Sequence, residues 1–235
     1  MHHVLLDRWS QGASPMHARD PRAKIAVLLV FLVALAITPA PNHLAIGIQA
    51  TLLIAGILVA GLPFFGMLAR AAVVLPFSLT FGLMSWLAGE PGRAVALVEK
   101  SYLSTLAVLL VVGTTPLPRL LAGMEALGVP RTLVLVAQFL YRYLFVISEQ
   151  AQHMRVAAAC RQDRGRHRRP RFRAAAGALA VLFARSYQRA EGIHRAMLAR
   201  AFSGQFSPLR SSSFGLIDAC FLTAVSLFVG MTLLV

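Results

Sequence analysis

Lysine and acidic residues are scarce in this sequence. Only Lys24 and Lys100 are lysines among the 23 basic residues, and nine acidic residues leave a formal net charge of +14. Charged residues make up 14% of the chain, against about 25% in soluble domains, and 57% of its residues are hydrophobic. This composition argues against a soluble globular protein and predicts a membrane protein. Because Arg stays charged and its planar fork holds carboxylates or phosphates, the arginines suit fixed contacts.

Catalytic motifs are also missing. The sequence has no G-x-x-x-x-G-K-[ST] loop for ATP phosphates, no G-x-S-x-G nucleophile elbow and no H-E-x-x-H zinc pair. Its histidines are scattered, and Cys160 and Cys220 show no metal-type or redox spacing, so we expect unpaired thiols. The first 24 residues are polar, which predicts no cleaved signal peptide. We therefore expect no enzyme activity, no catalytic residue, no metal site and no cofactor.

Apolar segments long enough to cross a bilayer dominate both ends of the chain, since about 20 apolar residues span the hydrocarbon core. They predict an all-α polytopic membrane protein with about five spanning helices. The N-terminal region 1–115 holds four of these helices and the C-terminal region 214–235 holds the last. Pro76 lies inside the third segment and predicts a kink there. The predicted spans are 24–38, 44–62, 69–88, 94–115 and 214–235.

The block 116–213 has a different character. Sixteen of the 21 arginines lie in it, and its four acidic residues leave a net charge of +12. Residues 131–150 are apolar enough for a sixth span, but Arg142 lies at the centre, where an arginine costs at least about 2.5 kcal/mol on insertion scales. We interpret this segment as a long helix in or near the cytoplasmic interface. Arg142 and Glu149, seven residues apart, then share one face of it.

The distribution of basic residues predicts the topology. Arg8, Arg19, Arg22 and Lys24 precede or begin the first span and place the N-terminus in the cytoplasm by the positive-inside rule. Five spans then leave the arginine-rich block in the cytoplasm and the C-terminus outside. Six spans would put residues 151–213, with most of the positive charge, outside. We therefore expect a multi-pass protein of the cell inner membrane with a cytoplasmic coupling region.

Two similar patterns occur in the basic block, AAACRQDRG at 157–165 and AMLARAF at 196–202. In each, small residues lead to an arginine, Arg161 in the first and Arg200 in the second. Small side chains let another surface approach a helix closely, and an arginine can then bind a carboxylate with two parallel hydrogen bonds. From the residues alone, a basic face exposed to solvent or lipid explains the arginines equally well.

The two patterns resemble the paired Ala-Arg-Gly signatures of the transmembrane T component of energy-coupling factor (ECF) transporters. Further stretches resemble its cobalt-type branch, the CbiQ family: HARDPRAKI, LPRLLAGMEALGVP, YRYLFVISEQAQHMRVAAACR and RSYQRAEGIHRAMLARAF. In that family the T component joins a substrate-capturing membrane subunit to two ATP-binding-cassette ATPase subunits. The resemblance therefore implies a coupling subunit of an ATP-driven metal-ion importer, with cobalt as the ion and nickel as the second candidate.

The resemblance also assigns residues. Arg161, flanked by Cys160 and Gln162, and Arg200, flanked by Ala199 and Ala201, would each dock into one ATPase subunit. Gln162 and Ala201 stand where the family typically has glycine, and Cys160 stands where alanine is typical. On a helical wheel, Arg185, Arg189 and Arg200 lie within about 60°, and Tyr187, Met197 and Leu198 lie on the opposite arc. That apolar arc would contact the other coupling helix or the substrate-capturing subunit.

Two other classes of function compete with this reading. A membrane-anchored basic protein could bind nucleic acid or anionic lipid through residues 155–173. Phe172 is the one aromatic residue in that stretch, whereas single-strand binding uses several stacking aromatics, so we expect no nucleic-acid partner. We expect the arginines of 164–173 to lie near membrane lipid, which attracts each with about 1 kcal/mol. A membrane-embedded enzyme would need the acid, base and nucleophile that the sequence lacks.

Overall fold

The structure is a computed structural model of the chain that describes residues 9–10, 12, 14–40, 42–161, 168–202, 204 and 215–232. Throughout these ranges the regular elements are helices, with no β-strand, and the predicted all-α class is confirmed. The chain divides into two compact units, Met1–Val129 with Ser211–Val235, and Pro130–Arg210. Each unit is described below by itself.

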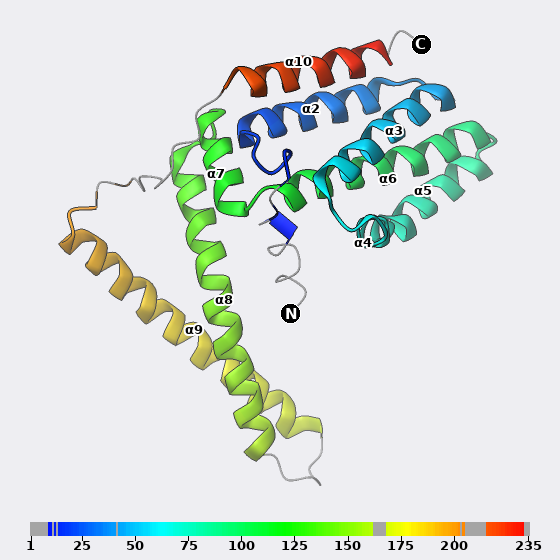
Figure 1. Cartoon of the computed structure of the whole chain (residues 1–235). Coiled ribbons are helices and arrows are strands. Elements are labelled where there is room, and N and C mark those ends of the chain that lie inside the picture. The colour runs from blue at the N-terminus through cyan, green and yellow to red at the C-terminus, as the bar shows by residue number, and fades with distance from the viewer. Residues whose placement is uncertain are drawn as a thin grey trace. The chain divides into compact units, whose positions relative to one another are not determined.

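The first unit is a bundle in which neighbouring helices along the chain are joined by short turns (Figure 1). Its central helix, α6, packs on α2, α3, α4 and α5, while α10 and α7 pack on α2. The helices of this unit are α2 (Pro21–Ile37), α3 (His43–Ala60), α4 (Phe64–Ala71), α5 (Leu75–Leu87), α6 (Pro91–Thr114), α7 (Leu117–Ala126) and α10 (Leu216–Met231). Residues Ile57, Met67 and Leu106 lie in its buried apolar core.

Three predicted spans correspond to helices with the length and composition to cross a membrane: α3, the segment Phe64–Leu87 and α6. The predicted first and last spans correspond to α2 and α10, which have 17 and 16 residues. At 1.5 Å per residue these two helices reach about 24–26 Å, slightly less than the hydrocarbon core of about 30 Å. The chain is therefore a polytopic helical membrane protein.

The break predicted at Pro76 is present. A short 3-10 turn, η1 (Ala72–Val74), separates α4 from α5, and Pro76 lies in the first turn of α5. Proline has no backbone N–H to donate, and the first turn of a helix needs none. The chain therefore changes helix at this point and still continues in one apolar segment.

The outer surface of the bundle is apolar. Phe77, Phe81 and Leu87 on α5 are all more than half exposed. A contiguous apolar surface of this kind is rare on soluble proteins, whereas a bilayer solvates it. The exposed aromatic and aliphatic side chains of α5 therefore fit contact with lipid.

The second unit consists of two long helices, α8 (Arg131–Arg161) and α9 (Arg168–Ala199). They pack on each other and cross in Figure 1. α8 begins after Pro130, which restricts the preceding backbone and supplies no donor, so the helix starts naturally there. By length and composition α8 also qualifies as a membrane span, although only 6% of its most apolar window is buried.

Candidate functional site

Small side chains are frequent among the half-buried residues of α8 and α9, with Met154 and Leu182 as larger ones. The half-buried residues near the end of α8 recur at helical spacing and include Ala151, Met154 and Ala158. On α9, Ala178 and Ser186 are half-buried in the same way. Small residues at such positions let two helix backbones approach closely without large interlocking side chains. The contact therefore fixes the crossing of two helices that are otherwise mostly exposed.

The two candidate docking arginines lie at separate ends of this helix pair. Arg161 is the last residue of α8, and Arg200 directly follows α9. From Arg168 to Arg200 the helix rises about 48 Å, and the seven residue steps from 161 to 168 reach at most about 25 Å. The two arginines are therefore separated by at least about 23 Å. One small ligand cannot bind both, whereas two protein surfaces can.

The end of α9 is a Schellman motif. The backbone N–H of Phe202 donates to the carbonyl of Met197 at 3.0 Å, and the N–H of Ala201 donates to Leu198 at 3.0 Å. Ala201 has a φ of 53°, a left-handed conformation that glycine usually supplies at this position. The alanine at 201 therefore keeps the helix ending that a glycine would give, with some backbone strain.

This ending determines where Arg200 lies. Arg200 is the residue between the last helical residue and the left-handed residue, and it is exposed. The final carbonyls of a helix carry partial negative charge, so an arginine is electrostatically favoured there. Ala199 and Ala201 on either side are also exposed and leave the space around Arg200 open. The arrangement presents a guanidinium at a blunt helix end.

The end of α8 is described in less detail. Cys160 lies in the last turn of α8, is exposed and is a free thiol. Gln162 lies outside the described residues together with residues 163–167, and α9 begins at Arg168, so residues 168–173 belong to that helix. Arg161 is thus the last residue of α8 that the structure describes, whereas Arg200 directly follows the described end of α9.

Comparison with known proteins identifies the family. A family model described as a cobalt transport protein, CbiQ, matches residues 12–210. The chain belongs to the CbiQ family. It is also 30% identical over 151 residues to the cobalt transport protein CbiQ of Rhodobacter capsulatus, an alignment that covers 64% of this chain and 61% of that protein. The match thus spans about three fifths of the length of that relative.

The apolar arc of α9 is exposed in this CbiQ-family chain. Tyr187 and Leu198, which the wheel places opposite the arginines, are 61% and 62% exposed, and Met197 is half-buried. Of the two contacts expected for this arc, the one with the other long helix is thus not made by Tyr187 or Leu198. Their side chains are left open to another partner.

Arg142 and Glu149 are both exposed on α8, as expected for residues that share one face of the helix. The Arg142 guanidinium carbon lies 6.0 Å from the centre of the Tyr143 ring, at the limit of a cation–π contact. Leu133 and Val136 are more than half exposed as well. α8 therefore shows apolar and charged side chains to its surroundings at once, as an interfacial helix does.

The structure also reveals a polar cluster at one end of the CbiQ-family bundle that sequence reasoning missed. Lys24 is 2% exposed, and its ammonium donates to the carbonyl of Thr114 at 3.0 Å and to the hydroxyl of Thr115 at 2.9 Å. These two threonines end α6, where carbonyls have no partner within the helix. Lys24, which the sequence indicated only as a topology signal, thus provides hydrogen-bond donors to the C-terminal end of α6.

Asp20 and Asp218 complete this cluster. The Asp20 carboxylate accepts from the N–H of Arg22 at 2.8 Å and caps the start of α2. The backbone N–H of Asp20 donates to Asp218, in the first turn of α10, at 3.2 Å, and Arg19 lies 3.8 Å from the same carboxylate. Asp followed by Pro is a recognisable helix start, but no sequence pattern indicates the partner almost 200 residues away.

Proposed function

We propose that this chain is the transmembrane coupling subunit of an ATP-driven metal-ion importer of the ECF type, and that the ion is cobalt, with nickel as the second candidate. Membership of the CbiQ family supports a role in cobalt transport. The observation that carries the coupling role is the pair of crossed long helices that place Arg161, the last described residue of α8, and Arg200, which directly follows α9, at least about 23 Å apart along the backbone. Two arginines at that separation suit two ATPase subunits.

The chemistry of docking follows from the helix ends. Arg161 and Arg200 each bind carboxylates in a groove of one ATPase subunit, and the exposed small residues Cys160 and Ala199 let the groove wall close around the helix end. Binding through a planar guanidinium fixes orientation as well as position. Movement of the two ATPase subunits on ATP binding and hydrolysis is then transmitted along α8 and α9.

The first unit supports a cytoplasmic position for this coupling region. Lys24 joins the start of α2 to the end of α6, and Asp218 joins the start of α10 to Asp20. α7, which follows α6, packs against Pro21 at this same end, so the chain leaves the bundle after α7 and re-enters it before α10 at one end. If α8 crossed the membrane, α9 would have to cross back with its seven arginines, each at a high insertion cost. We therefore place both helices on the cytoplasmic side, with the N-terminus.

The substrate-capturing membrane subunit binds, in this proposal, to the exposed apolar arc of α9. Phe183, Tyr187 and Leu198 are each more than 60% exposed and recur on one side of the helix. Aromatic and aliphatic side chains of this kind form the centre of protein interfaces. Ion capture belongs to that partner, and this chain converts ATPase motion into its rearrangement.

The test compares arginines at the helix ends with arginines along the helix. Arg161→Ala and Arg200→Ala are each expected to weaken co-purification of the ATPase subunits and to abolish most cobalt uptake. Removing one partner of a buried charge pair costs about 2–5 kcal/mol, and an exposed arginine about 0–1 kcal/mol. Arg185→Ala and Arg189→Ala, both exposed in the middle of α9, are the matched controls.

All four variants must insert in the membrane at the wild-type level. Lysine at 161 or 200 is expected to restore ATPase binding only in part, because it keeps the charge and loses the fork. Equal ATPase binding and cobalt uptake in the four alanine variants would mean that the arginines act as a general basic surface. The coupling function would then be wrong.

A further inference from the structure

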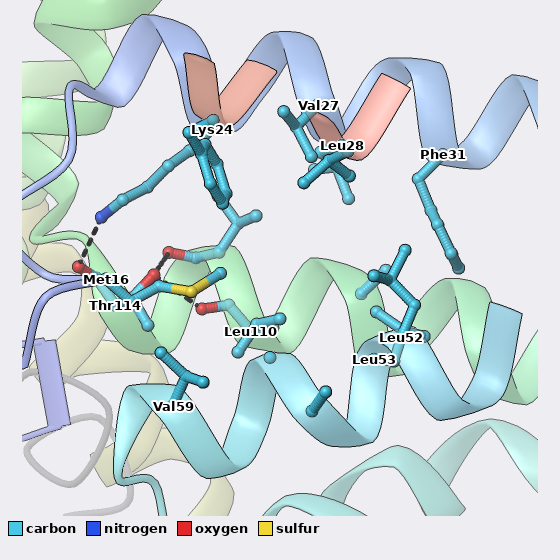
Figure 2. A pocket seen from close by; sticks show the side chains of 16 residues that line it. Met16, Lys24, Val27, Leu28, Phe31, Leu52, Leu53, Val59, Leu110 and Thr114 are labelled. Atoms are coloured by element: carbon cyan, nitrogen blue, oxygen red, sulfur yellow. Dashed lines mark hydrogen bonds between the residues drawn. The ribbon is translucent and has the colours of Figure 1, made fainter. Parts of the chain in front are cut away.

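An apolar groove lies inside the first unit, between α2 and α3. These two helices follow each other in the chain, yet both pack on α6 and make little contact with each other. The space between them has a volume of about 220 Å³ and includes Val27, Phe31, Leu53 and Leu110 in its lining. Figure 2 shows Lys24 at one end of the groove and Phe31 at the other. Except for Lys24 and Thr114, every lining residue is apolar.

The groove has the depth of part of one bilayer leaflet. Its lining runs over seven residue steps on each of three helices: Lys24 to Phe31, Leu52 to Val59, and Ala107 to Thr114. Seven steps of a helix rise about 10 Å, and one leaflet contributes about half of the 30 Å hydrocarbon core. Because α2 begins and α3 and α6 end near Lys24, that end of the groove lies toward the membrane surface.

The groove is open to its surroundings along α3, where Ala55 and Val59 line it and are exposed. Water fills a cavity stably only where two to four polar groups can bond it, and these walls offer almost none. In a membrane, an apolar chain from the bilayer fills such a groove in place of water. The geometry therefore fits an extended hydrocarbon chain that enters beside α3.

The charge at the Lys24 end determines the class of lipid. The charges of Arg19, Asp20, Arg119 and Asp218 all act on Lys24, and Arg119 is exposed. Three basic groups, Lys24 included, stand against two acidic ones, so this end has a net charge of one positive unit. Basic residues at the membrane surface next to a cleft between helices attract anionic headgroups.

We propose that the groove between α2 and α3 is a binding site for an anionic phospholipid, which inserts one acyl chain beside α6 and holds its phosphate near Arg119. Lys24 forms the floor of the headgroup end, because its ammonium is already bonded to the end of α6. The bound lipid seals the bundle on the side where α2 and α3 do not meet.

The experiment uses the full chain, purified in detergent and washed free of bound lipid. It is titrated with phosphatidylglycerol or phosphatidylcholine of identical acyl chains, each carrying a photoreactive diazirine halfway along one chain, and crosslinks are mapped by mass spectrometry. We expect crosslinks on α2, α3 and α6, with phosphatidylglycerol saturating at lower concentration. One arginine is worth about fivefold in lipid affinity, so Arg119→Gln weakens phosphatidylglycerol binding about fivefold, whereas Arg22→Gln, on the opposite side of α2 from Lys24, changes it less than twofold. Phosphatidylcholine binding stays unchanged.

Blocking variants test the groove itself. Ala55→Trp and Val59→Trp fill the open side and are expected to reduce crosslinking at least tenfold. Leu58→Trp is the control on the same helix, since Leu58 is 67% exposed and does not line the groove, and its crosslinking stays within twofold. Elution at the wild-type volume in size-exclusion chromatography confirms that each variant is folded.

Three results would overturn the proposal. The first is undiminished crosslinking in both blocking variants, and the second is equal affinity for the two lipids. The third is a partner helix in the groove of the assembled transporter, detected as protein crosslinks from the same positions with the lipid displaced. None of these outcomes depends on ATPase docking, so the lipid site can fail while the coupling function stands.

Discussion

The two units of the chain differ in what their helices pack against. In the bundle, helices bury one another and buried polar contacts join their ends, as with Lys24 and Asp218. In the second unit, α8 and α9 touch at their crossing and expose most of their remaining surface. The bundle is thus organised by its own contacts and the bilayer. α8 and α9 present exposed surfaces that are open to other partners.

The attachment of α10 illustrates the first kind of organisation. At one end of α10, the Asp218 carboxylate accepts a hydrogen bond from the backbone N–H of Asp20. At the other end, the fully buried Gln49 amide donates to the hydroxyls of Thr38 at 3.3 Å and Thr232 at 3.1 Å. A buried amide or carboxylate without partners is costly, so these bonds specify one position of α10 against α2. Hydrogen bonds thus hold α10, a helix of only 16 residues, at both of its ends.

The largest effect is expected at Lys24. Lys24→Met keeps the length of the side chain and removes the ammonium, which leaves the carbonyl of Thr114 and the hydroxyl of Thr115 without their buried donor. Breaking a buried charged contact costs about 3 kcal/mol or more. Chemical unfolding in detergent should show this loss, whereas Arg22→Met, at an exposed position in the same turn, should change stability by less than about 0.5 kcal/mol. Similar losses in both variants would contradict a specific role of Lys24.

A Gly→Ala substitution should change the stability in opposite directions in the two units. A Cβ at Gly123 on α7 would lie 2.9 Å from the Cβ of Pro21 on α2, so Gly123→Ala should destabilise the bundle by about 1–3 kcal/mol. A Cβ at Gly192 on α9 would meet nothing within 4 Å, so Gly192→Ala should stabilise that helix by about 0.5–1 kcal/mol. Chemical unfolding in detergent measures the change for Gly123→Ala, and the helix content measures it for Gly192→Ala. Equal signs would mean that the units are packed alike.

A smaller effect is expected at the end of α9. Ala201→Gly removes the strain of a left-handed alanine and keeps the Schellman hydrogen bonds, so the helix end should gain about 1 kcal/mol. Slower amide exchange at Ala201 and Phe202 would reveal the gain. Ala199→Gly, inside the helix, is the control and should speed exchange there. Faster exchange in Ala201→Gly would show that the left-handed conformation is not populated.

Most helices of the bundle could be predicted from sequence because their signals are local. Long apolar segments specify α3 and the second half of α6, and Pro76 indicates the break before α5. The partners of Lys24 and Asp218 could not be predicted, since they lie 90 or more residues away and no local pattern encodes a tertiary contact. The grouping of α7 with the bundle was missed for the same reason.

The candidate site shows the same division. The sequence placed Arg161 and Arg200 in similar small-residue contexts; the structure puts Arg200 directly after α9 and Arg161 at the last described position of α8. The left-handed conformation of Ala201 had no signal in the residue itself, because alanine rarely adopts it; the one indication was that the family typically has glycine at this position. The exposure of Tyr187 could not be foreseen either, since the wheel gives a direction and not the neighbour that covers it.

The most direct test of the coupling function uses the two native cysteines, both of which are free and exposed. Cys160 lies next to Arg161 at the end of α8, and Cys220 lies in α10 of the bundle. Their rates of maleimide labelling are measured in detergent with and without the ATPase subunits. Coupling through the helix ends predicts that bound ATPase slows labelling of Cys160 at least tenfold and leaves Cys220 unchanged. Labelling of Cys160 at the same rate in the assembled complex would contradict it.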